Sequence, residues 1–162
     1  MRTVLWRLGE TQCVALNWND GEQRGGGEQH SRMSDFRKLD VWHNSHALVL
    51  NVHGAVKKIR GSDYASLRSQ MLRAGMSIPT NLVEGVGQKT AREFARFIRI
   101  SLNSANELEY HLLLARDLEV MPAEEFSTLV AQTIQVRKML HGLLKRVDGR
   151  SNDSNQKRSP RR

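Results

Sequence analysis

Four apolar series with helical spacing dominate this sequence and leave little room for any other secondary structure. In one of them the core-type side chains recur in alternating steps of four and three, at Phe94, Ile98, Ser101, Ala105, Leu108, Leu112 and Ala115. Steps of three and four place residues on one face of an α-helix, whereas a half-buried strand needs strict alternation. A matching series begins at Phe126 and ends at Val147. The pattern therefore predicts an all-α chain.

Break signals divide the series into separate helices. Gly61, Ser62 and Asp63 interrupt the pattern, because glycine ends helices and serine or aspartate caps the next one. Thr90 and Glu93 have the spacing of a capping box. We therefore expect helices over about residues 40–59, 64–86, 91–118 and 122–147. Since the connections are short, successive helices should be antiparallel neighbours. The predicted fold is an antiparallel up-down-up-down four-helix bundle.

The second helix is expected to bend at Pro79. Proline removes one backbone hydrogen bond, and its ring clashes with the carbonyl four residues back, here that of Gly75. The missing Cβ of Gly75 would ease a local bend. We predict a Pro-kinked continuous helix, and two helices broken at Ser77 are the alternative.

The same helix carries more apolar surface than one bundle needs. Leu67, Met71, Ala74, Ile78 and Leu82 form one stripe, and Leu72, Met76, Pro79, Val83 and Val86 form a second beside it. Together they cover an arc of about 200°, against the ~100° of an ordinary surface helix. We therefore expect a homo-oligomer whose interface contains Leu72, Met76, Val83 and Val86, with deep burial in the chain's own bundle as the alternative.

The remaining arc of the second helix is polar. Arg73, Ser77, Asn81 and Glu84 follow one edge of it at near-helical spacing. Satisfied polar groups between helices fix register. We interpret these residues as a structural polar seam, with Arg73 paired to Glu107 or Glu109 on the third helix.

Both ends of the chain look unlike the bundle. Residues 1–32 lack any period and are expected to be a disordered leader, with Met33 as a true or alternative start. Residues 33–148 form the bundle, and residues 149–162 are expected to be a disordered basic tail. The single cysteine, Cys13, excludes an intrachain disulfide and favours a reducing, cytoplasmic location. No apolar run approaches the ~20 residues of a membrane span.

The sequence contains no clear motif for an enzymatic or a metal site. A di-iron bundle needs paired Glu-x-x-His motifs, and none occurs. The histidines at positions 43, 46 and 53 share one side of the first helix, but such residues are more often surface or core groups than ligands. Arg137 and His141 lack the spacing of an all-α ribonuclease site. We expect no catalytic residues, no metal and no cofactor.

Basic side chains are the strongest remaining signal. The formal net charge is +8, and residues 1–32 contribute none of it because they hold four basic and four acidic groups. Lys89 is followed by Arg92, Arg96 and Arg99, which lie on the third helix opposite its core stripe. Such a row can follow a phosphate backbone. The hypothesis is RNA or DNA binding, and a solvated helix face is the alternative.

Three stretches resemble a known family. They are FRKLDVW from Phe36, LRSQMLRAGMSIPTNLVEG from Leu67 and EFARFIRISLNSANELE from Glu93. They resemble the four-helix-bundle proteins encoded in intervening sequences of bacterial 23S ribosomal RNA genes. The most specific motif is S-I-P-x-N-x-x-E-G, which runs from Ser77 to Gly85. The sequence departs from the family pattern at Leu82, Val83 and Asn103.

The resemblance implies a homopentamer arranged as a barrel, without established enzymatic activity. A related branch contains accessory proteins of diversity-generating retroelements, which act beside a reverse transcriptase and its template RNA. Two functions are therefore expected to compete. One is a non-enzymatic, homo-oligomeric RNA- or DNA-binding bundle. The other is an interaction scaffold or accessory subunit for a reverse transcriptase.

Overall fold

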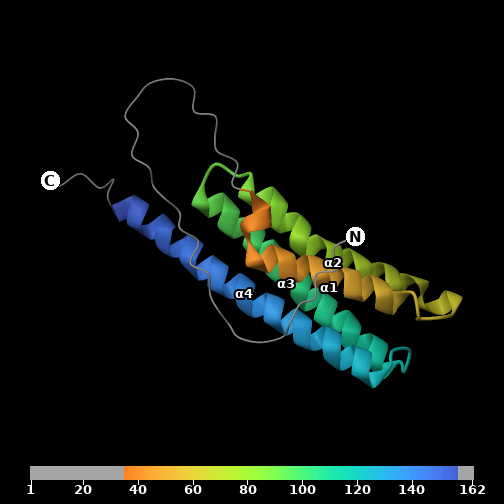
Figure 1. The fold of residues 1–162 in the computed structure, drawn as a ribbon. Coiled ribbons are helices and arrows are strands. Elements are labelled where there is room, and N and C mark those ends of the chain that lie inside the picture. Colours follow the sequence, from red (N-terminus) through yellow and green to blue (C-terminus); the bar gives the residue numbers. More distant parts are fainter. Residues whose placement is uncertain (1–34, 157–162) are drawn as a thin grey trace, which may run out of the picture. The chain divides into compact units, whose positions relative to one another are not determined.

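The described part of the chain, residues 35–156 in a computed structural model, is helical and contains no strand. Side chains are described for residues 35–149. The elements are η1 (Phe36–Lys38), α1 (Asp40–Val56), η2 (Ser62–Tyr64), α2 (Ala65–Val86), α3 (Ala91–Asp117) and α4 (Ala123–Gln156). They pack as a four-helix bundle (Figure 1), so the all-α prediction and its four helices are confirmed.

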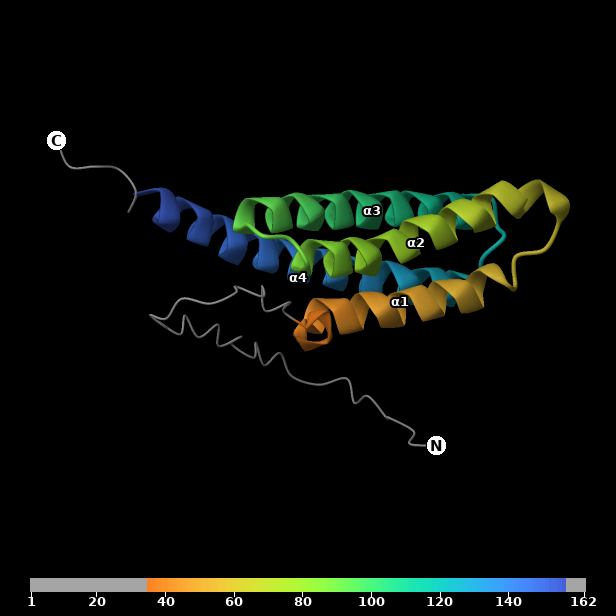
Figure 2. The same cartoon turned by 90° about the horizontal axis from the view of Figure 1, so that it is seen from above.

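Cross-helix contacts give the direction of each neighbour. Between α2 and α3, Arg73 forms an ion pair with Glu107 and Ser77 is hydrogen-bonded to Ser104. Residue numbers therefore decrease along α3 in the direction in which they increase along α2. Between α1 and α4, Asn51 bonds to Gln132 and Lys58 to Glu125, which gives the same opposite order. The helices of these two pairs therefore run in opposite directions, and Figure 2 shows α2 between α3 and α1.

Local sequence signals account for the helix boundaries. Gly61 has φ 94°, a left-handed conformation that glycine adopts without a Cβ penalty, and it separates α1 from α2. The hydroxyl of Thr90 accepts from the Glu93 amide, and the Glu93 carboxylate accepts from the Thr90 amide. This is the expected capping box. At the other end, α4 continues to Gln156. Gly149, where the pattern predicted a tail, lies inside that helix.

The core consists of the predicted helix faces. The first stripe of α2, Leu67 to Leu82, is buried throughout, as are the predicted core positions of α1 from Val41 to Ala55. Ile59 is also buried, but it lies in the turn after α1, which ends at Val56 and not at residue 59 as predicted. Four polar side chains are buried among the described residues, and each has a hydrogen-bond partner: Ser45, Ser101, Ser104 and Thr133. Ser101 donates its hydroxyl hydrogen to the Ile78 carbonyl at 3.0 Å, and Thr133 donates to the Leu129 carbonyl at 2.7 Å. Buried hydroxyls with partners carry little desolvation penalty.

Helix α2 is continuous through Pro79, which is buried. The alternative of two helices broken at Ser77 is therefore wrong, and the kink itself stays a prediction. Near its end, α2 approaches α3 at Gly85. A Cβ built there would lie 2.7 Å from Cδ2 of Phe94 and 2.8 Å from Cβ of Phe97. The close approach of the two helices requires glycine at this position.

Three expectations fall on residues beyond the described range. The leader at residues 1–32 and the start at Met33 lie outside it, as do residues 157–162 of the expected tail. Within the described range, no helix is both long and apolar enough to cross a membrane.

Candidate nucleic-acid interface

The cations expected to contact nucleic acid lie on one outward face at the start of α3. Lys89 immediately precedes the Thr90 cap, and Arg92, Arg96 and Arg99 follow within the first turns; all are exposed. Core-facing positions in the same turns, such as Ile98, are fully buried. The structure therefore brings these side chains together on the surface, and we call Lys89, Arg92, Arg96 and Arg99 the α3 basic face.

One member of the α3 basic face has an acidic partner. The Nη2 atom of Arg99 lies 2.7 Å from Oδ2 of Asp148 on α4, and both side chains are roughly half exposed. Among residues 35–149, no carboxylate pairs with Lys89, Arg92 or Arg96. Three of the four charges are thus uncompensated by an ion pair, and Asp148 reduces the positive field at the fourth.

Helix α4 adds a cation that the sequence pattern did not single out. Lys145 is exposed and lies three residues before Asp148, a spacing that places side chains next to each other on a helix. Because Asp148 reaches Arg99, Lys145 lies within one turn of the point where α4 contacts the α3 basic face. Its spacing from Asp148 was visible in the sequence. The contact between Asp148 and Arg99 was not, because only the packing of α4 on α3 creates it.

The polar seam on α2 faces α3 and is hydrogen-bonded at three of its four positions. Arg73 forms an ion pair with Glu107 at 3.1 Å. Of the two partners expected for Arg73, Glu107 and Glu109, the structure thus selects Glu107. Ser104 donates to the Ser77 hydroxyl at 2.8 Å, and Asn81 donates to the same hydroxyl at 3.0 Å. Glu84 is exposed, and its carboxylate has no partner among the described residues. Its role in helix register stays a prediction.

The expected oligomer interface is the most apolar exposed surface of α2. Met76 is 54% exposed and Val83 38%, while Leu72 and Val86 are half-buried. Pro79, which the pattern placed in the same stripe, is buried in the chain's own bundle. The excess apolar arc therefore remains on the surface of the single chain, and the alternative of deep burial fails for Met76 and Val83.

Three of the remaining candidate residues, His43, His46 and Arg137, make ordinary contacts within the bundle. The His43 ring nitrogen Nε2 lies 2.6 Å from the Arg37 carbonyl oxygen, and the His46 ring stacks on Trp42 with 5.2 Å between centroids. Arg137 bonds to Asn106 and pairs with Glu109. Across the residues that the structure describes, no group of three potential metal ligands comes together.

The fold and surface define a class of helical bundle with an exposed basic face and a partly exposed apolar stripe. A family model described as 23S rRNA-intervening sequence protein matches residues 37–142. The chain belongs to this family. The match spans α1, α2, α3 and most of α4 and includes the α3 basic face.

A solved structure shows the same fold. It is a protein of unknown function from the S23 ribosomal protein family of Bacteroides thetaiotaomicron, 24% identical, with a TM-score of 0.61. The similarity covers 65% of this chain and 98% of that one. A comparison with curated proteins finds no match. The neighbour therefore supports the bundle fold, and function has to be argued from the surface.

Proposed function

We propose that this protein is a non-enzymatic, homo-oligomeric bundle of the cytoplasm that binds RNA or DNA through the α3 basic face. The observation that carries the proposal is the row of exposed cations at Lys89, Arg92 and Arg96, none of them paired with a carboxylate among the described residues. Unpaired guanidinium groups are well suited to phosphate oxygens because they offer several donors in a planar fork.

The chemistry of this face favours the backbone over the bases. Phosphate contacts position a protein on nucleic acid but carry no sequence information. The α3 basic face lies at the start of one helix and includes no aromatic side chain on which a base could stack. Binding should therefore be weak, tolerant of sequence and strongly dependent on salt. In an oligomer the same face would recur in every subunit, which raises the apparent affinity through multivalency.

Changing Arg92, Arg96 and Arg99 together to glutamine should weaken nucleic-acid binding by about tenfold or more at low salt, because up to three phosphate contacts are lost. The slope of log affinity against log salt should flatten by up to about 0.7–0.9 per lost contact. Fluorescence anisotropy with labelled single-stranded and duplex RNA, at several salt concentrations, measures both quantities.

The matched control is Lys58→Gln with Arg73→Gln and Arg116→Gln. It removes the same charge from cations that already pair with Glu125, Glu107 and Asp117. Exposed pairs of this kind contribute little to stability. The control should retain most of the binding. Equal losses in both triple variants would mean that net charge alone, rather than the α3 basic face, causes binding.

Replacing Asp148 by asparagine should strengthen binding by about two- to fivefold, because it frees Arg99 and removes a charge that repels phosphate. Asp117→Asn is the control, since Asp117 pairs with Arg116 at the other end of α3. The same anisotropy titration applies. A weaker complex with Asp148→Asn would show that the ion pair organises the site instead of restraining it.

A second candidate function is an interaction scaffold or accessory subunit, for example for a reverse transcriptase. The exposed apolar side chains on α2, Met76 at 54% and Val83 at 38%, favour it, because such surfaces mark protein contacts. If the wild-type protein fails to bind RNA or DNA even at low salt, the scaffold function replaces the first proposal.

A further inference from the structure

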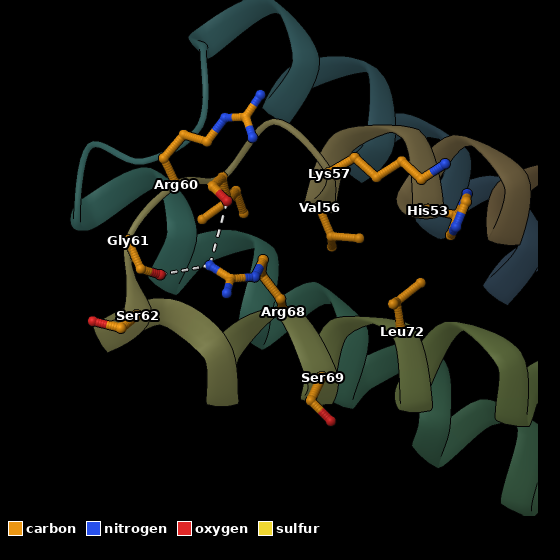
Figure 3. A pocket seen from close by; sticks show the side chains of 10 residues that line it. His53, Val56, Lys57, Arg60, Gly61, Ser62, Arg68, Ser69 and Leu72 are labelled. Carbon is orange, nitrogen blue, oxygen red and sulfur yellow. Dashed lines mark hydrogen bonds between the residues drawn. The ribbon is translucent and has the colours of Figure 1, made fainter.

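A pocket opens at the end of the bundle opposite the α3 basic face. It lies between the last turn of α1, the turn at Gly61 and the first turns of α2 (Figure 3). Its volume is about 480 Å³. Pockets that hold small organic ligands commonly measure ~300–1,000 Å³. The lining residues are His53, Val56, Lys57, Ile59, Arg60, Gly61, Ser62, Arg68, Ser69 and Leu72. The space is thus sufficient for a small molecule.

The lining combines positive charge with an apolar wall. Lys57, Arg60 and Arg68 supply basic side chains, His53 adds an imidazole, and none of the lining residues is acidic. Val56, Ile59 and Leu72 supply apolar surface between them. Positive groups in a concave surface concentrate the field on an anion. The pocket therefore suits a ligand that has an anionic end and an apolar or flat body.

The guanidinium of Arg68 is held in place by the turn. Its Nη1 donates to the Gly61 carbonyl at 2.8 Å and to the Ile59 carbonyl at 3.3 Å. These bonds leave Nε and Nη2, for which the structure gives no partner among the described residues. In Figure 3 the Arg68 guanidinium extends from α2 toward the turn at Gly61. The Lys57 side chain runs along α1 toward His53. A half-buried, oriented guanidinium recognises phosphate better than a mobile cation does.

A neighbouring pocket differs in charge, because its lining includes acidic residues. It measures about 590 Å³ and is lined on the other side of α1 by Lys58 together with Glu124 and Glu125. Lys58 pairs with Glu125 at 2.8 Å, so its charge is compensated. Lys57, one residue earlier, has no such partner among residues 35–149. Adjacent lysines thus face an acidic and a basic pocket.

We propose that the pocket at the α1–α2 turn binds a phosphate monoester with a flat organic body, as in a nucleoside 5′-monophosphate. Arg68 contacts the phosphate, Lys57 adds a second positive charge to the lining, and Val56 and Ile59 pack against the base or ribose. The same chemistry occurs in a free nucleotide and at the 5′-phosphate end of an RNA. The site is separate from the α3 basic face and does not depend on nucleic-acid binding there.

Isothermal titration of the full-length protein with AMP, inorganic phosphate and adenosine tests the ligand class. AMP should bind most tightly, because it satisfies both the charged and the apolar parts of the pocket. Inorganic phosphate should bind more weakly and adenosine more weakly still. Adenosine binding as tightly as AMP, or AMP failing to bind at millimolar concentration, overturns the proposal.

Lys57→Gln should weaken AMP binding by at least fivefold, because it removes one of the three Lys and Arg charges that line the pocket. Lys58→Gln is the matched control, since it removes the same charge from the acidic pocket, and it should change AMP affinity by less than twofold. Equal effects of the two variants would place the ligand elsewhere. Circular dichroism of both variants checks that α1 remains folded.

Competition between AMP and short RNAs distinguishes a free nucleotide from an RNA end as the source of the phosphate. A short RNA with a 5′-phosphate should compete with AMP if the pocket receives an RNA end, and the same RNA with a 5′-hydroxyl should not. Failure of both RNAs alongside AMP binding identifies a free nucleotide as the ligand. The Arg92, Arg96 and Arg99 triple variant should bind AMP as the wild type does. Loss of AMP binding in that variant would refute a separate site.

Discussion

Replacing Gly85 by alanine is expected to lower the free energy of unfolding by about 1–3 kcal/mol, the usual cost of overpacking a well-filled core. The new Cβ would lie 2.7 Å from the Phe94 ring and 2.8 Å from Cβ of Phe97. The ring can rotate away, but the Phe97 Cβ is fixed to the α3 backbone. The helices must therefore separate, and this cost exceeds the ~1 kcal/mol that alanine gains over glycine in a helix.

Gly142→Ala on α4 is the matched control. Nothing lies within 4 Å of a Cβ built at this exposed helical position. The variant should be more stable than the wild type by up to ~1 kcal/mol, since only helix propensity changes. Urea unfolding followed by circular dichroism measures both variants. If Gly85→Ala is as stable as Gly142→Ala, the contact between α2 and α3 at Gly85 is looser than described.

Replacing Val83 by glutamate is expected to dissociate the proposed oligomer at micromolar concentration. If Val83 is covered by another subunit, the variant buries a carboxylate without a partner, which costs several kcal/mol and weakens assembly by about a hundredfold or more. The fold should survive, because Val83 is 38% exposed in the single chain. Light scattering after size-exclusion chromatography gives the mass, and the family resemblance leads us to expect five subunits in the wild type.

Leu50→Glu serves as the control for assembly. Leu50 is 59% exposed and lies on α1, outside the α2 stripe. This variant adds the same charge and should remain assembled. A wild-type protein that is monomeric at micromolar concentration would contradict the oligomer outright. Dissociation by Leu50→Glu and not by Val83→Glu would move the interface to the α1 surface.

The helices were predictable because their signals are local. The steps of three and four from Phe94 to Ala115 define a helix face without any knowledge of its neighbours. The capping box at Thr90 and Glu93 depends on residues three apart, and the break at Gly61 depends on a single residue. The end of α4 was less predictable. Its apolar series stops at Val147, but the backbone continues helical to Gln156 without that support.

The candidate sites were predictable only in part. The row from Arg92 to Arg99 follows from spacing on one helix, and so does the apolar stripe of α2. Which members of that stripe stay exposed depended on packing, since Pro79 is buried and Met76 is not. Sequence could not separate Glu107 from Glu109 as the partner of Arg73, because both lie on the same segment of α3 and the choice rests on helix rotation.

By itself the sequence determined the class of fold, the helix faces, the caps and the positions of the exposed cations on α3, because all of these depend on residues within a few turns of each other. The tertiary structure alone decided that Asp148 meets Arg99 and that Lys57 and Arg68 border one pocket while Lys58 faces Glu125. These relations join distant segments. They depend on how each helix is rotated and shifted against its neighbour, which close packing of the whole core sets and no local spacing encodes.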